Sequence, residues 1–342
     1  MEIKQLESVK GFVIYDLPGA DTYVGPSRLG AKLAPGNAEM LVRHQTYVFA
    51  LAEQRKSGAT IGLKVDPEDT DAAVNALAGE LASEFESQHL LTSPGLRLNR
   101  ESLGPILRHD KRNPVVRDNR DGVTFEDELL ALGAVTCAAF FAKPSGKWDA
   151  AIEGFNQTGI GVAREIETQG GTVKRISTNK GCVSGNFDSA TLADAWLEAG
   201  ADCVEQLGSV EKAWTIWKSD VDAIFVGSKP GAMSGDGAKG VGETPIIATS
   251  AAAVSSKALA ILRKNNTPVA ADFLSNIGPA LAWWAPEETS QDELRSSTSA
   301  SVTGLLEETA NHTDGSFMAA CYKAEAFMES WQEQRPFGRP LG

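Results

Sequence analysis

Residues 148–159 read Trp-Asp-Ala-Ala-Ile-Glu-Gly-Phe-Asn-Gln-Thr-Gly, and this stretch decides the fold class of the chain. Its first six residues are mostly apolar and predict a short buried strand, and a helix is predicted over residues 160–169 directly after the turn. A turn of this kind that binds a dinucleotide uses three glycines, for a tight bend, for close approach of a pyrophosphate and for helix–strand packing. Gly154 and Gly159 occupy the first and last of these positions, and Asn156 occupies the middle one. The turn therefore predicts an anion site at a helix N-terminus, although the same spacing also fits a tight turn that binds nothing.

Strands and helices alternate along the rest of the second half of the chain. The predicted strands and helices are, in order, strand 171–177, helix 190–199, strands 223–227 and 245–249, helix 255–264 and strand 268–274. Strands that alternate with helices of about 10–15 residues are typical of βαβ units around a parallel sheet. Residues 287–334 then read as helical. The second half is therefore predicted to form a Rossmann-like domain.

The first half mixes strand-like and helical stretches. Strands are predicted over 8–16 and 60–65, helices over 37–54, 67–87 and 125–143, and a loop over 108–122. The Pro144-Ser-Gly146 break that follows marks the predicted domain boundary. We therefore expect an α/β protein with an α+β domain over residues 1–145, a Rossmann-like domain over residues 146–342, and a cleft between them.

The composition excludes several classes of function. The chain has 342 residues, with 32 Lys and Arg against 45 Asp and Glu, so its net charge is −13. Such an acidic chain repels phosphate backbones and anionic lipids, so neither a nucleic acid nor a membrane is an expected partner. No apolar run approaches the ~18 residues of a membrane span, and the first residues do not resemble a secretory signal. A cytoplasmic protein is expected.

Neither the cysteines nor the histidines are spaced as metal ligands are. The four cysteines stand alone at Cys137, Cys182, Cys203 and Cys321, without any Cys-x-x-Cys pair. The four histidines are scattered as well. We therefore predict buried free thiols and no metal site.

Several further residues are candidates for contact with a nucleotide. Gln157 and Thr158 complete the glycine turn, and Gly227 and Ser228 follow a predicted strand, where open α/β sheets bind their ligands. The second strand of the domain ends at Thr178-Asn179-Lys180, without the acid that binds the adenosine ribose in NAD enzymes. These residues suit a ribose phosphate, so NADP is at least as plausible as NAD. Lys180 is equally consistent with a solvated loop charge.

Six stretches, in order, resemble the glutamate/leucine/phenylalanine/valine dehydrogenase family. They are residues 25–30 (GPSRLG), 57–67 (SGATIGLKVDP), 151–159 (AIEGFNQTG), 173–185 (VKRISTNKGCVSG), 222–228 (DAIFVGS) and 269–278 (VAADFLSNIG). The resemblance implies a first domain that binds substrate and forms oligomers, a second domain that binds NAD or NADP, and a homo-oligomer. It also implies hydride transfer during oxidative deamination of an amino acid or reductive amination of its keto acid.

The same resemblance assigns roles to individual positions in the first domain. The family places a lysine where Arg28 stands, and a guanidinium also grips a substrate carboxylate. Val48 stands where a second lysine is expected, Thr60 where the catalytic lysine is expected, and Gly95 where the proton-transferring aspartate is expected. None of these three side chains can transfer a proton. Loss of a general acid or base typically costs ~10²–10⁴-fold in rate, so ordinary deamination of amino acids is not expected.

Positions near the expected cofactor are partly changed. Leu132 and Ala251 replace a threonine and an asparagine of the family pattern. Asn276 and Gly278 keep the pattern beside the nicotinamide, whereas Pro279 departs from it. The resemblance therefore implies that Asn276 touches both substrate and cofactor.

Three functions remain open at this point. The first is a nicotinamide-dependent oxidoreductase for a small carboxylate-bearing substrate with an imine or a related double bond, which needs positioning more than a base. The second is a non-redox enzyme or a ligand-binding protein, and the third is an inactive partner of a related enzyme. Replacement cations are Lys32 and Lys64, on strand-like segments expected to line the cleft, together with Lys56 and Arg97. Each of these is equally explained as a surface charge.

Overall fold

The structure of the chain is a computed structural model, and it describes residues 1–143, 146–333 and 338–341. The chain forms two compact units, Met1–Arg112 with Lys323–Pro340, and Asn113–Tyr322 with Leu341–Gly342. The division after Arg112 comes earlier than the expected boundary, because helix α5 (Phe125–Ala142) packs against α6 (Gln157–Thr168) and α13 (Gln291–Thr309) of the second unit. Pro144 and Ser145, on which the expected boundary rested, lie outside the described residues.

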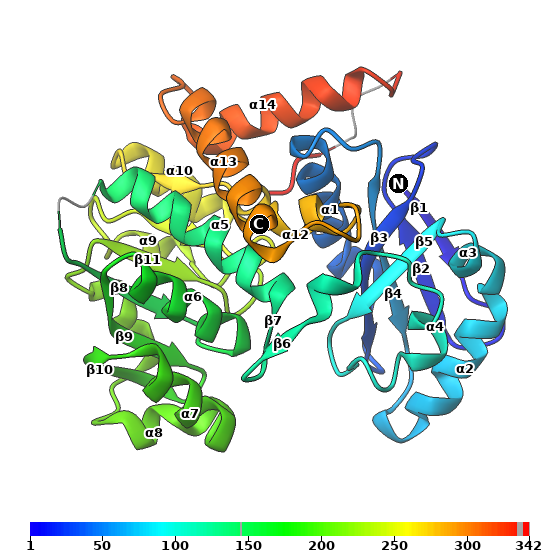
Figure 1. The fold of residues 1–342 in the computed structure, drawn as a ribbon, viewed down its shortest axis with the longest axis horizontal. Helices are drawn as coiled ribbons and strands as arrows, with labels where there is room; N and C mark the ends of the chain where they lie inside the picture. Colours follow the sequence, from blue (N-terminus) through cyan, green and yellow to red (C-terminus); the bar gives the residue numbers. More distant parts are fainter. Residues whose placement is uncertain (144–145, 334–337, 342) are drawn as a thin grey trace. The chain divides into compact units, whose positions relative to one another are not determined.

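The first unit is built on a mixed five-stranded sheet of order β1-β2-β4-β3-β5 (Figure 1). β2 pairs antiparallel with β1 and β4, whereas β3 pairs parallel with β4 and β5. The strands are β1 (Glu2–Gln5), β2 (Gly11–Tyr15), β3 (Tyr23–Leu29), β4 (Ser57–Leu63) and β5 (Leu90–Pro94). The helices are α1 (Glu39–Leu51), α2 (Thr70–Glu80), α3 (Ala82–Glu86) and α4 (Gly104–Leu107).

Alternation along the strands divides this unit into two layers of core. Val13 and Ile61 pack with buried residues of α2 and α4, whereas Phe12 and Ile14 pack on Val42 of α1. This follows from the two-residue period of a strand, which sends neighbouring side chains to opposite faces. The predicted strands at 8–16 and 60–65 correspond to β2 and β4. β1, β3 and β5 were not predicted, since β1 is a polar exposed edge and β3 contains Gly25-Pro26.

The second unit is built on a six-stranded sheet of order β10-β9-β8-β11-β12-β13. Its strands are β8 (Trp148–Glu153), β9 (Gly171–Thr178), β10 (Gly181–Phe187), β11 (Ala223–Val226), β12 (Ile246–Ala248) and β13 (Val269–Ala270). All neighbours pair parallel except β10, which runs antiparallel to β9. The strand order reverses between β8 and β11, and ligands of open α/β sheets bind at such a point. The predicted α/β fold class is therefore confirmed.

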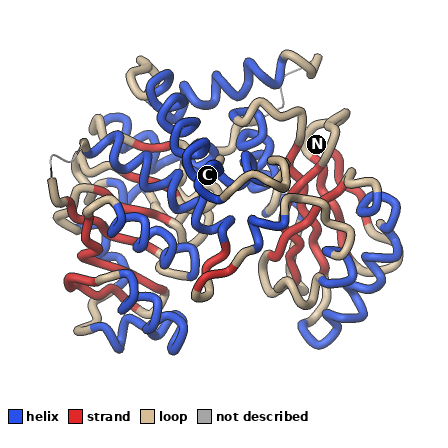
Figure 2. The backbone as a smooth tube through the Cα atoms, viewed as in Figure 1, coloured by secondary structure: helices blue, strands red, loops and turns tan. Residues whose placement is uncertain are grey.

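The helices of the second unit differ from the predicted ones at a few places. Besides α5, α6 and α13, they are α7 (Ser189–Ala199), α8 (Cys203–Leu207), α9 (Gly235–Ala238), α10 (Ser256–Lys264), α11 (Asp272–Ser275), α12 (Gly278–Ala282) and α14 (Ser316–Glu329). The strand predicted over 268–274 was wrong in its second half, because β13 ends at Ala270 and α11 follows. The helical stretch 287–334 forms two helices, α13 and α14, joined by a loop that ends at Gly315, which adopts a φ of +84° (Figure 2). Gln334 lies outside the described residues.

Two further features of the fold are the state of the cysteines and the length of the helices. All four cysteines are buried and none forms a disulfide, as predicted. None of the described helices is both long and apolar enough to cross a membrane. A short hairpin of β6 (Asn119–Arg120) and β7 (Val123–Thr124) precedes α5, which begins with a capping box between Thr124 and Asp127.

Candidate functional site

The carboxyl ends of four strands line up along one edge of the second unit's sheet. Glu153 of β8 pairs in register with Ser177 of β9 and with Val226 of β11, which in turn pairs with Ala248 of β12. The residues that follow these four positions therefore emerge at the same edge. This edge brings together three of the stretches that the sequence singled out, namely 154–159, 178–180 and 227–228.

Gly154 makes the turn from β8 to α6 possible. Its φ is +74°, a left-handed value that glycine adopts without strain. A Cβ at this position would lie 2.3 Å from the backbone N of Ser228 and 2.4 Å from its Cα. The glycine therefore allows the end of β8 to lie against the Gly227-Ser228 turn. The helix begins at Gln157, three residues before the predicted start.

Asn156 is the N-cap residue of α6, the helix whose N-terminus is the predicted pyrophosphate site. Its Oδ1 accepts a hydrogen bond from the backbone N–H of Gly159 at 3.0 Å, and its backbone is extended, as N-cap residues prefer. The side chain of Thr158 is also engaged, since its hydroxyl donates to Asp127 at 3.0 Å. The N–H groups of Gln157 and Thr158 belong to the first turn, where backbone donors lack intrahelical acceptors. The turn thus retains backbone N–H groups that can bind an anion, but the Asn156 side chain already accepts from one of them, the N–H of Gly159.

Glu153 is a residue of this edge that sequence reasoning missed. Its Oε2 accepts from the backbone N–H groups of Gly227 and Ser228, both at 3.2 Å, and its Oε1 accepts from the Ser228 hydroxyl at 2.6 Å. The carboxylate therefore lies between β8 and β11, at the reversal of strand order. The available signal was an acid at the last position of the strand before the glycine turn.

The turn between β9 and β10 places the three residues expected near a ribose. The Thr178 hydroxyl donates to the carbonyl of Ala201 at 2.7 Å and accepts from the N–H of Lys180 at 3.1 Å. Asn179 and Lys180 are exposed. Lys180 Nζ lies 2.7 Å from Asp202 Oδ1, and this contact raises the pKa of Lys180. The lysine is therefore already paired with a carboxylate at the surface.

Asn276 is linked to the carboxyl edge of the sheet by the Ser275 hydroxyl. The Ser275 hydroxyl donates to the carbonyl of Ala248 at 2.7 Å and lies 3.4 Å from Asn276 Oδ1, and Asn276 is 9% exposed.

Between β12 and α10, Ala252 has a left-handed φ of +54° and donates its N–H to the buried Asp272 carboxylate. Ser250 Oγ, in the same loop, is buried and has no hydrogen-bond partner among the described residues. Strained backbone and orphaned polar atoms of this kind concentrate at functional sites.

Arg28 of β3 is the most unusual charged group of the first unit. Its Nε and Nη2 atoms are buried and have no hydrogen-bond partner among the described residues, and burial lowers the pKa of its guanidinium. A buried guanidinium without an acceptor is expensive, so a bound carboxylate would satisfy donors that the fold leaves open. Gly95 packs beside it, because a Cβ on Gly95 would lie 3.0 Å from Arg28 Cγ and 2.5 Å from the Ser27 carbonyl oxygen. No side chain fits at position 95 unless the backbone moves.

The other positions with an implied catalytic role in the first unit are Thr60 and Val48, and only Thr60 lies on the same sheet face as Arg28. Arg28 pairs in register with Gly62 of β4, so Arg28, Thr60 and Gly62 lie on one face of the sheet. The Thr60 hydroxyl is buried and donates to the Pro26 carbonyl at 2.8 Å. Val48 is buried in α1, where it is part of the apolar core.

The candidate lysines do not lie on strands. Lys32 is exposed in a turn that follows β3, and Lys64 follows the last residue of β4 with its Nζ 5.8 Å from the Phe12 ring centroid. The expectation that both sit on strand-like segments was wrong, since the two strands end at Leu29 and Leu63. Arg97 is exposed, whereas burial lowers the pKa of Lys56.

Comparison with solved structures identifies the fold. The chain is similar to the hetero-hexameric glutamate dehydrogenase from Thermus thermophilus (Leu-bound form), with a TM-score of 0.79, 19% identity, and coverage of 94% of this chain and 84% of that one. It is also similar to glutamate dehydrogenase from Plasmodium falciparum, with a TM-score of 0.72, 14% identity, and coverage of 98% and 82%. L-tryptophan dehydrogenase from Nostoc punctiforme matches with a TM-score of 0.67 and 15% identity, over 96% and 97% of the two chains.

Sequence comparison adds no closer assignment. No protein-family model matches the chain, and no curated protein matches it by sequence. At the identities found, the structural likeness shows the fold alone. The chain has the fold of amino-acid dehydrogenases, with a mixed-sheet unit and a mostly parallel-sheet unit, as the resemblance implied.

Proposed function

We propose that this protein is an NAD(P)-dependent oxidoreductase that acts on a small carboxylate-bearing substrate with a carbon–nitrogen or related double bond. The observation that carries the proposal is the guanidinium of Arg28, whose Nε and Nη2 are buried and have no hydrogen-bond partner among the described residues. Its planar fork of donors matches a carboxylate and binds it with two parallel hydrogen bonds. A neutral ligand can accept hydrogen bonds from these donors but leaves the charge of the guanidinium uncompensated.

The residues at the edge of the second sheet suit a dinucleotide in part. The N-terminus of α6, the bend at Gly154 and the Gly227-Ser228 turn would hold its pyrophosphate. Thr178, Asn179 and Lys180 would face its adenosine ribose, and Asn276 its nicotinamide. The coenzyme supplies or accepts a hydride, and the chain's part is to position the acceptor carbon and exclude water. The Asn156 cap competes with the pyrophosphate, so we expect modest affinity.

The proposed substrate already contains its double bond. Attack of water on an imine needs a base, and Val48, Thr60 and Gly95 stand where the family resemblance puts a lysine, a lysine and an aspartate. The Thr60 hydroxyl is committed to the Pro26 carbonyl, and Gly95 has no room for a side chain. Hydride transfer to a preformed imine depends mainly on positioning, for which Arg28 provides a fixed anchor.

A second candidate function is a ligand-binding subunit without redox activity. The Asn156 cap on α6 and the Glu153 carboxylate beside Gly227 favour it, because both reduce the attraction of this edge for a pyrophosphate. A structurally similar glutamate dehydrogenase is hetero-hexameric and has a Leu-bound form. By that likeness an oligomer is expected, and it contains either copies of this chain or an active partner.

Reduction of a cyclic imine tests the proposal. NADH and NADPH oxidation is measured with 1-pyrroline-2-carboxylate and with 1-pyrroline, which lacks the carboxylate. We expect turnover of the acid, and Arg28→Gln should lower kcat/KM about 10–100-fold for the acid but not for 1-pyrroline. Arg108→Gln, at an exposed arginine of the same unit, is the matched control and should leave both rates unchanged.

Nucleotide binding separates the candidate functions, and an amino-acid panel tests the residue assignment. Absence of NADH and NADPH binding at millimolar concentration, by fluorescence titration, contradicts the oxidoreductase and leaves the ligand-binding subunit. A panel of twenty amino acids with NAD and NADP should show no deamination. Rapid turnover of glutamate or leucine would contradict the assignment of positions 48, 60 and 95.

A further inference from the structure

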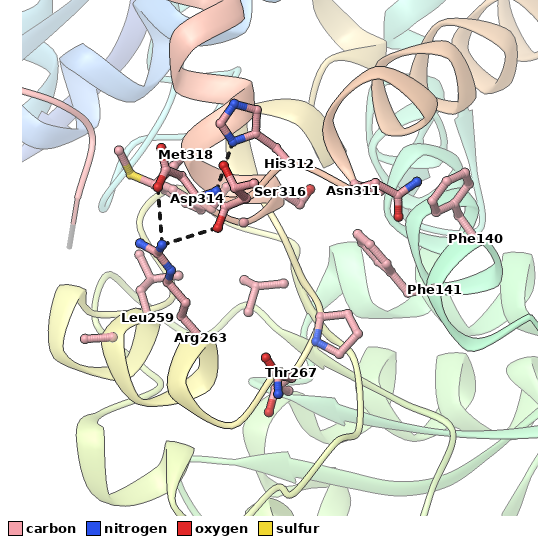
Figure 3. Close-up of a pocket in the computed structure, with 18 of the residues that line it drawn as sticks. Phe140, Phe141, Leu259, Arg263, Thr267, Asn311, His312, Asp314, Ser316 and Met318 are labelled. Carbon is pink, nitrogen blue, oxygen red and sulfur yellow. Dashed lines mark hydrogen bonds and ion pairs between the residues drawn. The ribbon is translucent and has the colours of Figure 1, made fainter.

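We propose that the second unit contains a separate binding site for a small monocarboxylic acid with an aromatic or branched apolar body. The site is a cavity of about 620 Å³ that is open to solvent on one side and lined by the end of α5, by α10 and the loop after it, and by the loop between α13 and α14 (Figure 3). A cavity of this size is typical of small-molecule sites. It goes beyond the function proposed above and does not depend on it.

The cavity lies at the opposite end of the sheet from the nucleotide edge. Thr267 and Pro268, which line it, precede β13, whereas Asp272 and Asn276 follow that strand. Phe140 and Phe141 lie in the last turn of α5, ahead of β8. The cavity therefore borders the amino ends of the parallel strands, and the candidate cofactor site borders their carboxyl ends.

One wall of the cavity is apolar. Phe140 and Phe141 make an edge-to-face pair with ring centroids 5.6 Å apart, and both rings line the cavity. Leu259 of α10 and Met318 of α14 also line the cavity, on the side of Arg263 and across from the two rings (Figure 3). Aromatic rings and a flexible thioether suit an aromatic or branched body, since they offer both edge-to-face and sulfur–ring contacts.

Ser316 supplies an unsatisfied polar group in the same cavity. It is the first residue of α14, is 9% exposed, and its hydroxyl has no hydrogen-bond partner among the described residues. The backbone N–H groups around it belong to the first turn of a 14-residue helix, where donors lack intrahelical acceptors. A buried hydroxyl without a partner is unfavourable, so a ligand oxygen at this place satisfies an open donor.

Arg263 provides the charge that recognises an anion. Both of its contacts among the described residues come from Nη2 and are long, 3.4 Å to the Thr313 carbonyl and 3.3 Å to Asp314 Oδ1. The side chains of Arg263 and Asp314 are 57% and 44% exposed, so this ion pair is weak. The guanidinium can therefore turn part of its fork to a ligand carboxylate.

Asp314 sets the charge of the ligand. Its Oδ2 accepts from the Tyr322 hydroxyl at 3.0 Å, and its own N–H donates to His312 Nδ1 at 3.0 Å. This fixed carboxylate repels any ligand charge that Arg263 does not neutralise. A dianionic phosphate carries such an extra negative charge and is therefore disfavoured. A monocarboxylate needs only one edge of the guanidinium, and we therefore infer a carboxylic acid rather than a phosphate.

Calorimetric titration of the full chain tests the site. The probes are 4-phenylbutyrate, its uncharged amide 4-phenylbutyramide, and inorganic phosphate. We expect the acid to bind at least tenfold more tightly than the amide or phosphate. The methyl signal of Met318, in protein labelled with [methyl-¹³C]methionine and identified with Met318→Leu, should shift when the acid binds.

Four variants locate the binding. Ser316→Ala should weaken the acid about three- to tenfold while leaving the thermal midpoint of the free protein unchanged or higher, because it removes an unsatisfied hydroxyl. Arg263→Gln should weaken it about tenfold, and Arg120→Gln, at an exposed arginine of the same unit, should have no effect. Arg28→Gln should leave the Met318 shift intact.

Three results would overturn the assignment. These are equal binding of acid and amide, no binding at millimolar concentration, and binding that is lost in Arg28→Gln but kept in Arg263→Gln. The last result would place the acid at Arg28, which supports the proposed function while removing this second site.

Discussion

The side chain of Asn156 accepts a hydrogen bond from the backbone N–H of Gly159, with 3.0 Å between Oδ1 and N. A glycine at position 156 would leave this donor open to a phosphate oxygen. The chain therefore keeps the strand–turn–helix geometry of a dinucleotide site while using part of its anion-binding capacity for its own helix cap. The expected consequences can be measured.

Replacement of Asn156 by glycine should strengthen nucleotide binding. The Gly159 N–H becomes available to the pyrophosphate, so we expect the dissociation constant of NADH or NADPH to fall about three- to tenfold. Glycine is itself an acceptable N-cap, so the free energy of unfolding should drop by only a few tenths of a kcal/mol. Fluorescence titration and urea unfolding measure the two quantities. Asn156→Ala, which loses the cap and costs about 1 kcal/mol, is the control; weaker binding in the glycine variant would contradict the assignment.

Gly154→Ala should be strongly destabilising. The residue has a φ of +74°, and its Cβ would lie 2.3 Å from the Ser228 N, so both strain and a backbone clash result. We expect a loss of about 2–4 kcal/mol in urea unfolding. Gly170→Ala is a matched control, because Gly170 has a φ of +75° but nothing lies within 4 Å of its Cβ position. That control should lose only about 1–2 kcal/mol, and equal losses would exclude the clash.

Replacement of Arg28 by methionine should stabilise the free protein. The change removes a buried charge whose Nε and Nη2 have no acceptor among the described residues, and it keeps an unbranched apolar stem. We expect a gain of about 1–3 kcal/mol in chemical unfolding. Acetate should raise the thermal midpoint of the parent protein by mass action, and the rise should be smaller in the variant. A destabilised variant that responds to acetate as strongly as the parent protein would remove the carboxylate site at Arg28.

The stability of the first unit should depend on Glu80 at acidic pH. Burial alone raises the pKa of this carboxyl, but the Ser8 hydroxyl and the N–H groups of Glu7 and Ser8 outweigh it and lower the pKa. A lowered folded-state pKa contributes stability above the unfolded value of about 4.3, and this contribution is lost as pH falls through the folded value.

Solvent screens this partly exposed carboxyl, so Glu80→Gln should cost only about 0.5 kcal/mol at pH 7, and the difference should shrink as pH falls below about 4. Unfolding free energies of both proteins between pH 7 and pH 3 measure it. Glu86→Gln, at an exposed glutamate of α3, is the control for the loss of one carboxylate charge from this part of the unit. A difference that grows on acidification would contradict the direction of the shift.

The sequence by itself determined the local elements and the fold class. Trp148–Glu153 is a strand with the predicted bounds, and α5 and α7 begin and end within a residue of the predicted helices. These signals are local, since apolar periodicity, a glycine turn and helix caps are set by neighbouring residues. The resemblance over six stretches also identified the fold that solved structures share with this chain.

Tertiary structure alone decided which groups are left without partners. The sequence named Arg28 as a cation, but only the packing around β3 shows that Nε and Nη2 are buried and lack a partner in the described part of the chain. Glu153 reaches Gly227 and Ser228, which lie 74 and 75 residues away, and Ser316 lines a cavity together with Phe141. Burial, hydrogen-bond partners and cavities depend on segments distant in the chain, whose approach is fixed by sheet order and helix packing rather than by any local pattern.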